Sequence, residues 1–257
     1  MAKNKKSLRL SKIRKELIYN CDEIIKLYTT MIGKAQFGEV TSHNYQQYIA
    51  GAGKNIGKAQ TGGDAQNYPL DPKTVSLLLR PAHAALVQEW LIFLESVFGR
   101  IVFHYLKTKT PEKLPSRHFY FSLKKVEPSS LVNIRKSIAD IAKESFSFEK
   151  YENRIKILRN IFKIKESQLD ETTKADIAKM NEEMKKQVTV RNIFQHNRGQ
   201  IRKTDLEEIG KKHFKMLNEK GENVTYNEGD DIILSMQEIE KLNNTIKEYS
   251  LKFEVLP

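Results

Sequence analysis

The residues best suited to chemistry lie in the segment VRNIFQHNRG, residues 190–199. Arg191 carries a planar, permanently charged guanidinium that matches the shape of a phosphate. Asn192 offers neutral hydrogen bonds to a hydroxyl or a phosphate oxygen, and His196 can give or take a proton near neutral pH. Together these side chains are suited to cleaving RNA without a metal ion, by attack of a 2′-hydroxyl on the neighbouring phosphate.

A helix must position these residues, and its geometry sets a condition on the site. Apolar periodicity from about Lys174 predicts that helix, and Gly199 is expected to end it in the left-handed conformation. Arg191 and His196 are five residues apart, so they diverge by about 140° on an ideal helix. Either the arginine reaches around the helix, or a second chain completes the site. Residues four positions apart lie on one face of a helix. On this helix such a face begins with three apolar side chains and ends with two polar ones: Met180, Met184, Val188, Asn192 and His196.

A purely structural role would explain the same residues without catalysis. A histidine near a helix end is more often a cap or a packing residue, and an arginine in a basic chain needs no special purpose. Clusters of polar side chains form functional sites in some proteins and purely structural networks in others. The residue types alone therefore leave both interpretations open.

The segment resembles the R-x4-6-H motif of the HEPN superfamily, with Arg191-Asn192 followed by His196. The downstream stretch GDDIILS, residues 229–235, is similar as well, and the resemblance extends over residues 71–253. It implies a helical bundle that dimerises, with the two motifs facing a shared cleft. One subgroup of the superfamily is modified on a tyrosine two residues after the histidine. That position is Arg198 here, so this regulation is not implied.

The resemblance also implies an activity, because many catalytic members are metal-independent endoribonucleases of toxin–antitoxin, abortive-infection and other antiviral systems. His196 would act as general acid or base, Arg191 would stabilise charge on the phosphate, and Asn192 would orient the reacting groups. An antitoxin or sensor protein would be a further partner. The alternative is a non-catalytic module of the same fold that binds RNA or a protein.

The charge of the chain favours a polyanionic partner. Lysine and arginine number 44 against 32 acidic residues, a formal net charge of +12. Basic charge alone is not specific, and it would equally suit a membrane surface. The expected RNA contacts are basic residues near the motif and on the helix before it: Arg198, Arg202, Lys203, Arg154, Arg159 and Lys163.

Other classes of site find little support. The single cysteine, Cys21, excludes an internal disulfide and a cysteine-based zinc site, and it is typical of a reducing cytoplasm. The acidic pairs Glu207-Glu208 and Asp230-Asp231 are adjacent residues that point in different directions, and His213, expected on a lysine-rich helix, has no partner. We therefore expect no metal and no cofactor. No apolar run reaches transmembrane length and no signal peptide is evident, so we expect a cytoplasmic protein.

The overall pattern predicts an all-α protein, a HEPN-like bundle with an N-terminal helical extension. Residues 1–70 would form a helix and a glycine-rich loop, packed on or appended to the main domain at residues 71–257. The central helix is expected at residues 71–107, because it is apolar nearly all round, with a restart or kink at Pro81. His83 and His104 on that helix are interpreted as structural.

The remaining helices follow from periodicity and capping signals. Helices are expected over 130–145 and 148–164, and capping boxes at Thr204-x-x-Glu207 and Ser235-x-x-Glu238 begin two more. Only residues 223–226 have an extended pattern. The glycine-rich stretch 50–63 lacks the spacing of a phosphate loop.

Overall fold

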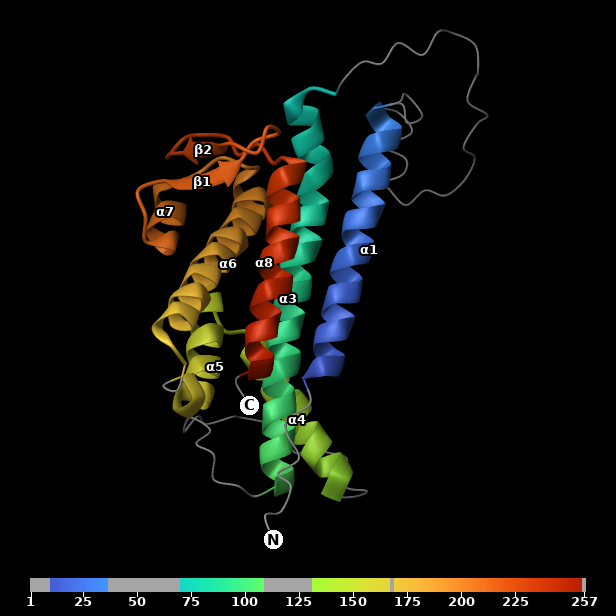
Figure 1. Ribbon diagram of the computed structural model, residues 1–257, viewed down its shortest axis with the longest axis vertical. Helices are drawn as coiled ribbons and strands as arrows, with labels where there is room; N and C mark the ends of the chain where they lie inside the picture. Colours follow the sequence, from blue (N-terminus) through green and yellow to red (C-terminus); the bar gives the residue numbers. More distant parts are fainter. Residues whose placement is uncertain (1–9, 37–69, 109–130, 167–168, 256–257) are drawn as a thin grey trace, which may run out of the picture.

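The computed structural model describes residues 10–36, 70–108, 131–166 and 169–255, with side chains for 10–33, 70–107, 131–161 and 169–253. The glycine-rich stretch 50–63 lies outside the described residues. Long helices dominate the architecture, and one small hairpin lies at the end of the bundle (Figure 1). In chain order the elements are α1 (Ser11–Gln36), α3 (Pro72–Thr108), α4 (Leu131–Ser147), α5 (Tyr151–Glu166), α6 (Glu171–Asn197), α7 (Lys203–Ile209), β1 (Phe214–Leu217), β2 (Asn223–Tyr226) and α8 (Met236–Val255).

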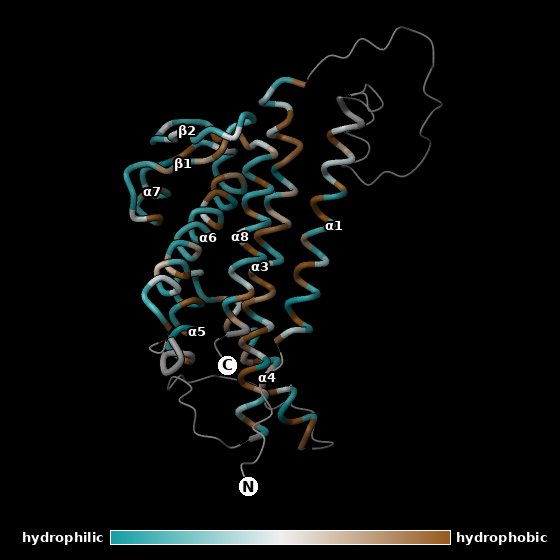
Figure 2. Tube along the Cα trace, in the orientation of Figure 1, coloured by the Kyte–Doolittle hydropathy of each residue, from teal (hydrophilic) through white to brown (hydrophobic). Residues whose placement is uncertain are grey.

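Helix α3 is the centre of the bundle, as its all-round apolar sequence predicts. Figure 2 shows hydrophobic residues along most of its length, and α1, α6 and α8 pack against it. The carboxylate of Asp71 caps its start by accepting the backbone N–H groups of Lys73 at 2.9 Å and Thr74 at 3.1 Å. Pro81 is exposed and does not divide the helix, which runs as one element from Pro72 to Thr108.

The N-terminal helix belongs to the same core. Leu17 and Cys21 of α1 are buried in the cluster that contains the α3 side chains. The side-chain amide of Asn20 donates to Glu89 on α3 at 2.8 Å, and Lys247 on α8 pairs with Asp22 at 2.5 Å. Of the two arrangements left open by the sequence, helix α1 is packed on the main domain. Burial raises the pKa of Cys21 to about 12, so this thiol is unreactive.

The segment between α6 and α8 differs from its predicted form. Helix α7 is short, and the carboxylate of Asp205, not Thr204, caps it by accepting the backbone N–H of Arg202 at 2.8 Å. Gly210 ends it with φ 78°, and the chain then forms an antiparallel pair of strands, β1 with β2.

The prediction of an extended segment at 223–226 is confirmed, but the partner strand β1 was missed. Phe214 and Met216 are buried and Lys215 is exposed, which is the alternation of a half-buried strand. His213 therefore precedes a strand and does not lie on a helix. The lysines around it hid this alternation, because they also suit the exposed face of a helix.

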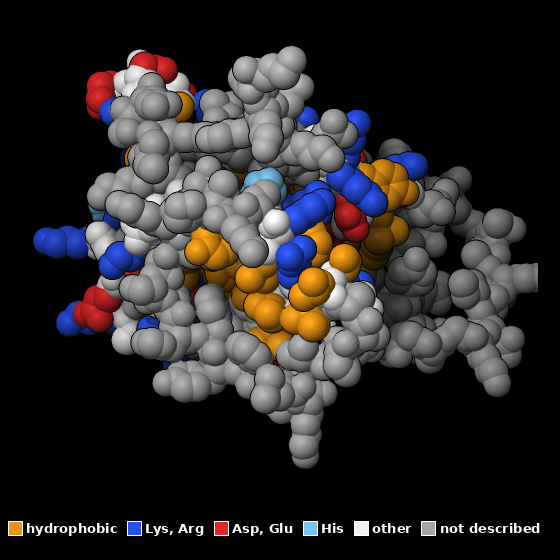
Figure 3. All heavy atoms as spheres, turned by 90° about the horizontal axis from the view of Figure 1, so that it is seen from below, with side chains coloured by type: hydrophobic (Ala, Val, Ile, Leu, Met, Phe, Trp, Pro, Cys, Tyr) orange, Lys and Arg blue, Asp and Glu red, His pale blue; other side chains and the backbone are white. Residues whose placement is uncertain are grey.

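The end of the molecule where α4 begins carries exposed apolar side chains. Figure 3 looks at this end and shows hydrophobic side chains gathered beside several lysines and arginines. Leu131 and Val132 at the start of α4 are 70% and 60% exposed.

Candidate functional site

The candidate motif forms the last two turns of α6. Asp170 caps the start of this helix by accepting the N–H of Thr173 at 2.8 Å. At its end Arg198 takes the left-handed conformation with φ 57°, and Gly199 follows with φ 104°. The helix therefore ends at Arg198, one residue before the predicted position at Gly199. Glycine is still favoured at position 199, because a φ of 104° is strained for any residue with a Cβ.

The predicted stripe on α6 is confirmed, and it divides the helix into a buried and an open part. Met184 and Val188 are buried, whereas Asn192 is half-buried and His196 is exposed. Residues 186–190 are buried on every side of the helix, because α3, α5, α7 and α8 all pack around it. Beyond residue 190 one face of the helix becomes accessible again, and the motif lies on that face.

One face of these last two turns presents the motif. Arg191 and Asn192 are half-buried and His196 is exposed, while Val190 and Ile193 on the opposite face are fully buried. At 100° per residue, Asn192 lies between Arg191 and His196 on an arc about 140° wide. The three side chains therefore share one open surface, with Arg191 and His196 at its two edges.

Arg191 lies at the edge next to α3. Its Nη2 donates to Oε1 of Gln88 at 3.1 Å, and its Nε is buried without an acceptor among the described residues. Burial lowers the pKa of Arg191, and the nearby charge of Arg154 acts in the same direction. No described carboxylate lies in ion-pair contact with it. Arg191 therefore does not reach around the helix to His196.

Asn192 and His196 keep their polar atoms available. Within the described part of the chain, neither side chain makes a hydrogen bond or an ion pair. The next residue, Asn197, is tied to α7 by a bond from its Nδ2 to the carboxylate of Asp205 at 3.1 Å. This contact holds the end of α6 and leaves the imidazole of His196 open to a ligand.

The predicted RNA-contact residues differ in exposure: four are exposed, one has a side chain outside the described residues, and one is buried. Arg198, Arg202, Lys203 and Arg159 are exposed, and Lys203 lies 3.9 Å from Glu207. The side chain of Lys163 lies outside the described residues.

Arg154 requires a correction. Its side chain is only 10% exposed, its Nη1 bonds Glu95 at 2.8 Å, and its Nε bonds the carbonyl of Glu149 at 2.8 Å. The carbonyl of Ser147 accepts from its Nη2. Arg154 thus joins α5 to α3, and its burial leaves little of the guanidinium accessible to a phosphate. Its sequence context, a basic helix, did not distinguish it from an exposed cation.

A groove of mixed charge runs between α5, α6 and α7. It consists of two adjoining hollows of about 610 and 480 Å³ that share Tyr151, Glu152 and Lys185. Lys185 pairs with Glu152, and Lys211 pairs with Glu182 at 3.1 Å. Two cations of the groove are thus matched by its own carboxylates, and the motif residues do not line it.

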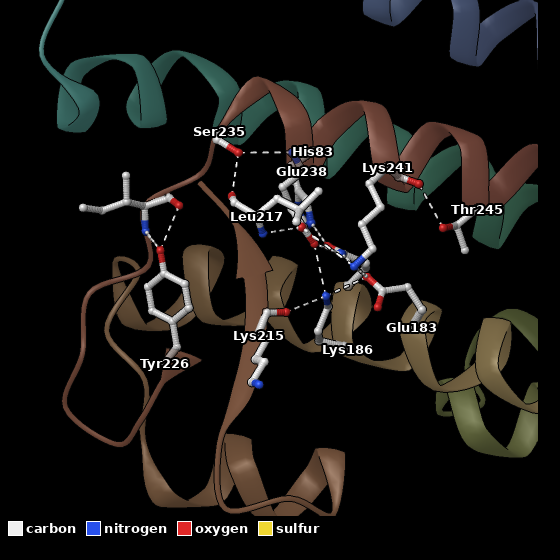
Figure 4. A network of polar contacts seen from close by, with 12 residues as sticks. His83, Glu183, Lys186, Lys215, Leu217, Tyr226, Ser235, Glu238, Lys241 and Thr245 are labelled. Atoms are coloured by element: carbon white, nitrogen blue, oxygen red, sulfur yellow. Dashed lines mark hydrogen bonds and ion pairs between the residues drawn. The ribbon is translucent and has the colours of Figure 1, made fainter. Parts of the chain in front are cut away.

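A buried polar network seats the motif helix, and the sequence did not reveal it. Figure 4 shows Lys186 of α6 beside Glu238 of α8. Glu238 is fully buried and accepts bonds from Lys186 Nζ at 3.1 Å, Gln187 Nε2 at 2.6 Å and the N–H of Leu217 at 2.8 Å.

The capping signal at Ser235-x-x-Glu238 accounts for only part of this geometry. The Ser235 hydroxyl accepts the N–H of Glu238 at 3.1 Å, as predicted, but the carboxylate turns towards α6 and β1. Lys186 and Gln187 occupy buried positions of α6. Buried polar side chains need partners, so these two residues were the signal that could have indicated a buried carboxylate such as Glu238.

His83 connects this network to the central helix, in the structural role expected for it. Gln187 Nε2 donates to Glu183 at 2.9 Å and to Glu238, so its Oε1 must accept from Nε2 of His83 at 2.7 Å. Full burial lowers the pKa of His83 to about 4, and the charges of Lys186 and Arg191 act in the same direction. The network thereby links α3, α6, α8 and β1 and fixes which face of α6 is open.

Two further classes of feature bear on function. Within residues 10–36, 70–108, 131–166 and 169–255, no three His, Cys, Asp or Glu side chains are arranged to hold a metal ion. Over the same residues, no helix combines the length and the apolar character needed to cross a membrane.

Comparison of the chain with protein-family models, with curated proteins and with solved structures finds no match.

Proposed function

We propose that this protein is a HEPN-like, metal-independent endoribonuclease that cleaves RNA by attack of a 2′-hydroxyl on the adjacent phosphate. One observation carries the proposal. Residues 186–190 of α6 are buried on all sides of the helix, and the face that opens over the next two turns presents Arg191, Asn192 and His196. Polar groups with the chemistry of phosphodiester cleavage thus occupy the accessible face that directly follows an enclosed section of the helix.

Each side chain has a role that suits its surroundings. His196 is exposed and acts as the general acid or base. Arg191 has a neutral amide and no described carboxylate as partner, so its charge is available to a phosphate. Asn192 lies between them and orients the reacting oxygen atoms through neutral hydrogen bonds.

The complete site belongs to a homodimer. In one chain Arg191 is held at the α3 edge of the open face, whereas His196 lies at the other edge. Two such faces meeting around a two-fold axis would bring two arginines and two histidines to one phosphate. In this proposal the protein is a cytoplasmic toxin or an antiviral, abortive-infection effector, and an antitoxin or sensor protein restrains it.

A non-catalytic module is the second candidate. The observation that favours it is the bond between Arg191 and Gln88, which separates the arginine from His196 in a single chain. Such a protein would use the open face of α6 to bind RNA or a protein and would not cleave.

The first test measures cleavage of total RNA by purified protein in excess chelator. We expect fragments ending in 2′,3′-cyclic phosphates from the natural protein. His196→Ala and Arg191→Ala should each lower the rate by about 100-fold or more, because each removes a group that acts in the transition state. Arg191→Lys should also be poor, since a point charge does not reproduce the guanidinium fork.

Matched controls separate chemistry from folding. His213→Ala and Arg100→Ala remove an exposed histidine and an exposed arginine that are not part of the motif, and both variants should cleave normally. Helix content and melting temperature should be unchanged in all variants. Absence of cleavage by the natural protein, or cleavage that survives in both motif variants, would contradict the proposal and favour the non-catalytic module.

A further inference from the structure

Three arginines lie along the seam between α3 and α6, beside the open face of the motif. Arg80 of α3 donates from Nη1 to the carbonyl of Arg198 at 3.1 Å, and its guanidinium carbon lies 4.7 Å from the ring centroid of Phe194. Phe194 in turn contacts His83, whose ring centroid is 6.0 Å away. The charge of Arg191 acts on the same His83, so all three arginines border one region.

These cations lack counter-charges in the described structure. None of Arg80, Arg191 and Arg198 has a described carboxylate within ion-pair distance, and the nearest acidic influence on Arg80 is the more distant Asp231. The Nε atoms of Arg80 and Arg191 are buried and have no acceptor among the described residues. Buried polar atoms without partners are uncommon in folded proteins and require an explanation.

Arg154 shows how this fold satisfies an arginine that serves structure. Its guanidinium has Glu95 at 2.8 Å and two backbone carbonyls as partners. Arg80 has a single carbonyl and the face of an aromatic ring. Among the described residues, Arg80 thus lacks the carboxylate that a structural arginine such as Arg154 has.

The spacing of the arginines distinguishes one anion from a chain of them. Gln88, which holds Arg191, follows Arg80 by eight residues on the same helix. Eight residues correspond to about 12 Å along the axis of α3. A single phosphate cannot contact both guanidinium groups across that distance, whereas successive phosphates of one strand can.

We propose that Arg80, together with Arg191 and Arg198, forms a strip that binds successive backbone phosphates of the RNA strand next to the cleaved bond. This inference rests on the proposed function and adds Arg80, on a different helix, to the substrate-binding residues. Arginine forks bind phosphate oxygens in pairs. A small rotation of the Arg80 side chain towards a phosphate would also provide its buried Nε with an acceptor.

The experiment measures binding without cleavage. The protein carries His196→Ala in every case, and the probe is a single-stranded 2′-O-methyl oligoribonucleotide, which cannot supply the attacking hydroxyl. Dissociation constants are measured over a series of salt concentrations. Arg80→Gln should weaken binding several-fold and lower the salt slope by about 0.7, the value for one lost phosphate contact on a single strand.

Two further variants keep the test decisive. Arg100→Gln, an exposed arginine twenty residues further along α3, should leave affinity and slope unchanged. Arg80→Lys keeps the charge but loses the fork, so affinity should fall while the slope is kept. This variant also decides the matter if Arg80→Gln unfolds, because an unchanged affinity in Arg80→Lys would overturn the proposal.

The outcomes separate this inference from the function on which it rests. If natural protein cleaves RNA through His196 but Arg80→Gln leaves the salt slope unchanged, only the strip is overturned. If the His196→Ala protein binds no RNA even at low salt, the proposed function fails with it. An oligoglutamate peptide that binds as tightly as the RNA, with the same dependence on Arg80, would overturn the assignment to a phosphate backbone.

Discussion

At the scale of single residues, the arginines of this protein show that neighbours decide the role of a side chain. Arg154 and Arg159 lie on the same basic helix, yet Arg154 is buried against Glu95 while Arg159 is exposed. Arg191 is half-buried, and among the described residues it bonds only the neutral Gln88. A cation with a matched buried carboxylate serves the fold, and one without a carboxylate is available to a ligand.

This contrast predicts different stabilities for two substitutions. Arg154→Ala should lower the free energy of unfolding by about 3–5 kcal/mol, because Glu95 is left as a largely buried charge without its partner. Arg159→Ala should change it by no more than about 0.5 kcal/mol, as is usual for surface positions. Chemical denaturation of both variants provides the measurement. Equal, small effects would show that the Arg154–Glu95 pair contributes nothing to the fold.

At the scale of elements, the polar network fixes how α6 is rotated against its neighbours. Lys186 also donates to the carbonyl of Lys215 at 3.0 Å, and the Ser235 hydroxyl donates to the carbonyl of Leu217 at 2.6 Å. Side chains from α6 and the start of α8 thus satisfy the outer edge of β1. A rotation of α6 would break these bonds and bury the motif, so the network determines which residues are open.

The histidine in this network predicts a pH dependence of stability. The pKa of His83 falls from 6.5 to about 4 on folding, chiefly through burial. Between these values the unfolded chain binds a proton that the folded chain does not, so the contribution is fully present above about pH 6.5. It is lost as the pH falls towards 4, and its size is on the order of 3 kcal/mol.

Substitution of the histidine tests this dependence. His83→Gln can still donate to Gln187, so the variant should fold and should lose this part of the pH dependence between pH 6.5 and 4. His213→Gln, at an exposed histidine, should keep the natural profile. Urea denaturation at several pH values gives the comparison. A natural protein whose stability does not change over this range would contradict the neutral state of buried His83.

At the scale of the whole molecule, the proposed active site requires two chains. Arg191 and His196 lie at opposite edges of an open arc, and Arg191 is held towards α3. A mixed dimer of one natural chain and one differently tagged His196→Ala chain should therefore have well below half of the natural activity, because the only cleft lacks one of its groups. Measurement of the purified mixed dimer tests this. Activity of one half would indicate two independent sites, and a monomer that cleaves RNA would exclude the shared cleft.

The sequence alone determined most of the helical architecture. Helix α3, the stripe on α6 and the cap at Asp71 follow from periodicity and capping residues, because these signals act between residues about four positions apart. The motif was also visible, since a polar end to an apolar stripe needs no knowledge of neighbouring helices. The long helices agree with the predicted ones to within a few residues, whereas α7 ends at Ile209 and does not reach His213.

The tertiary structure alone decided the partners of the polar groups. Arg80 meets the carbonyl of Arg198 across 118 positions of the chain, and Arg154 meets Glu95 across 59. The strand β1 and the orientation of Glu238 likewise depend on α6 lying beside α8. Charge and residue type are properties of the sequence, but the counter-charge and the accessible face depend on which distant elements pack together.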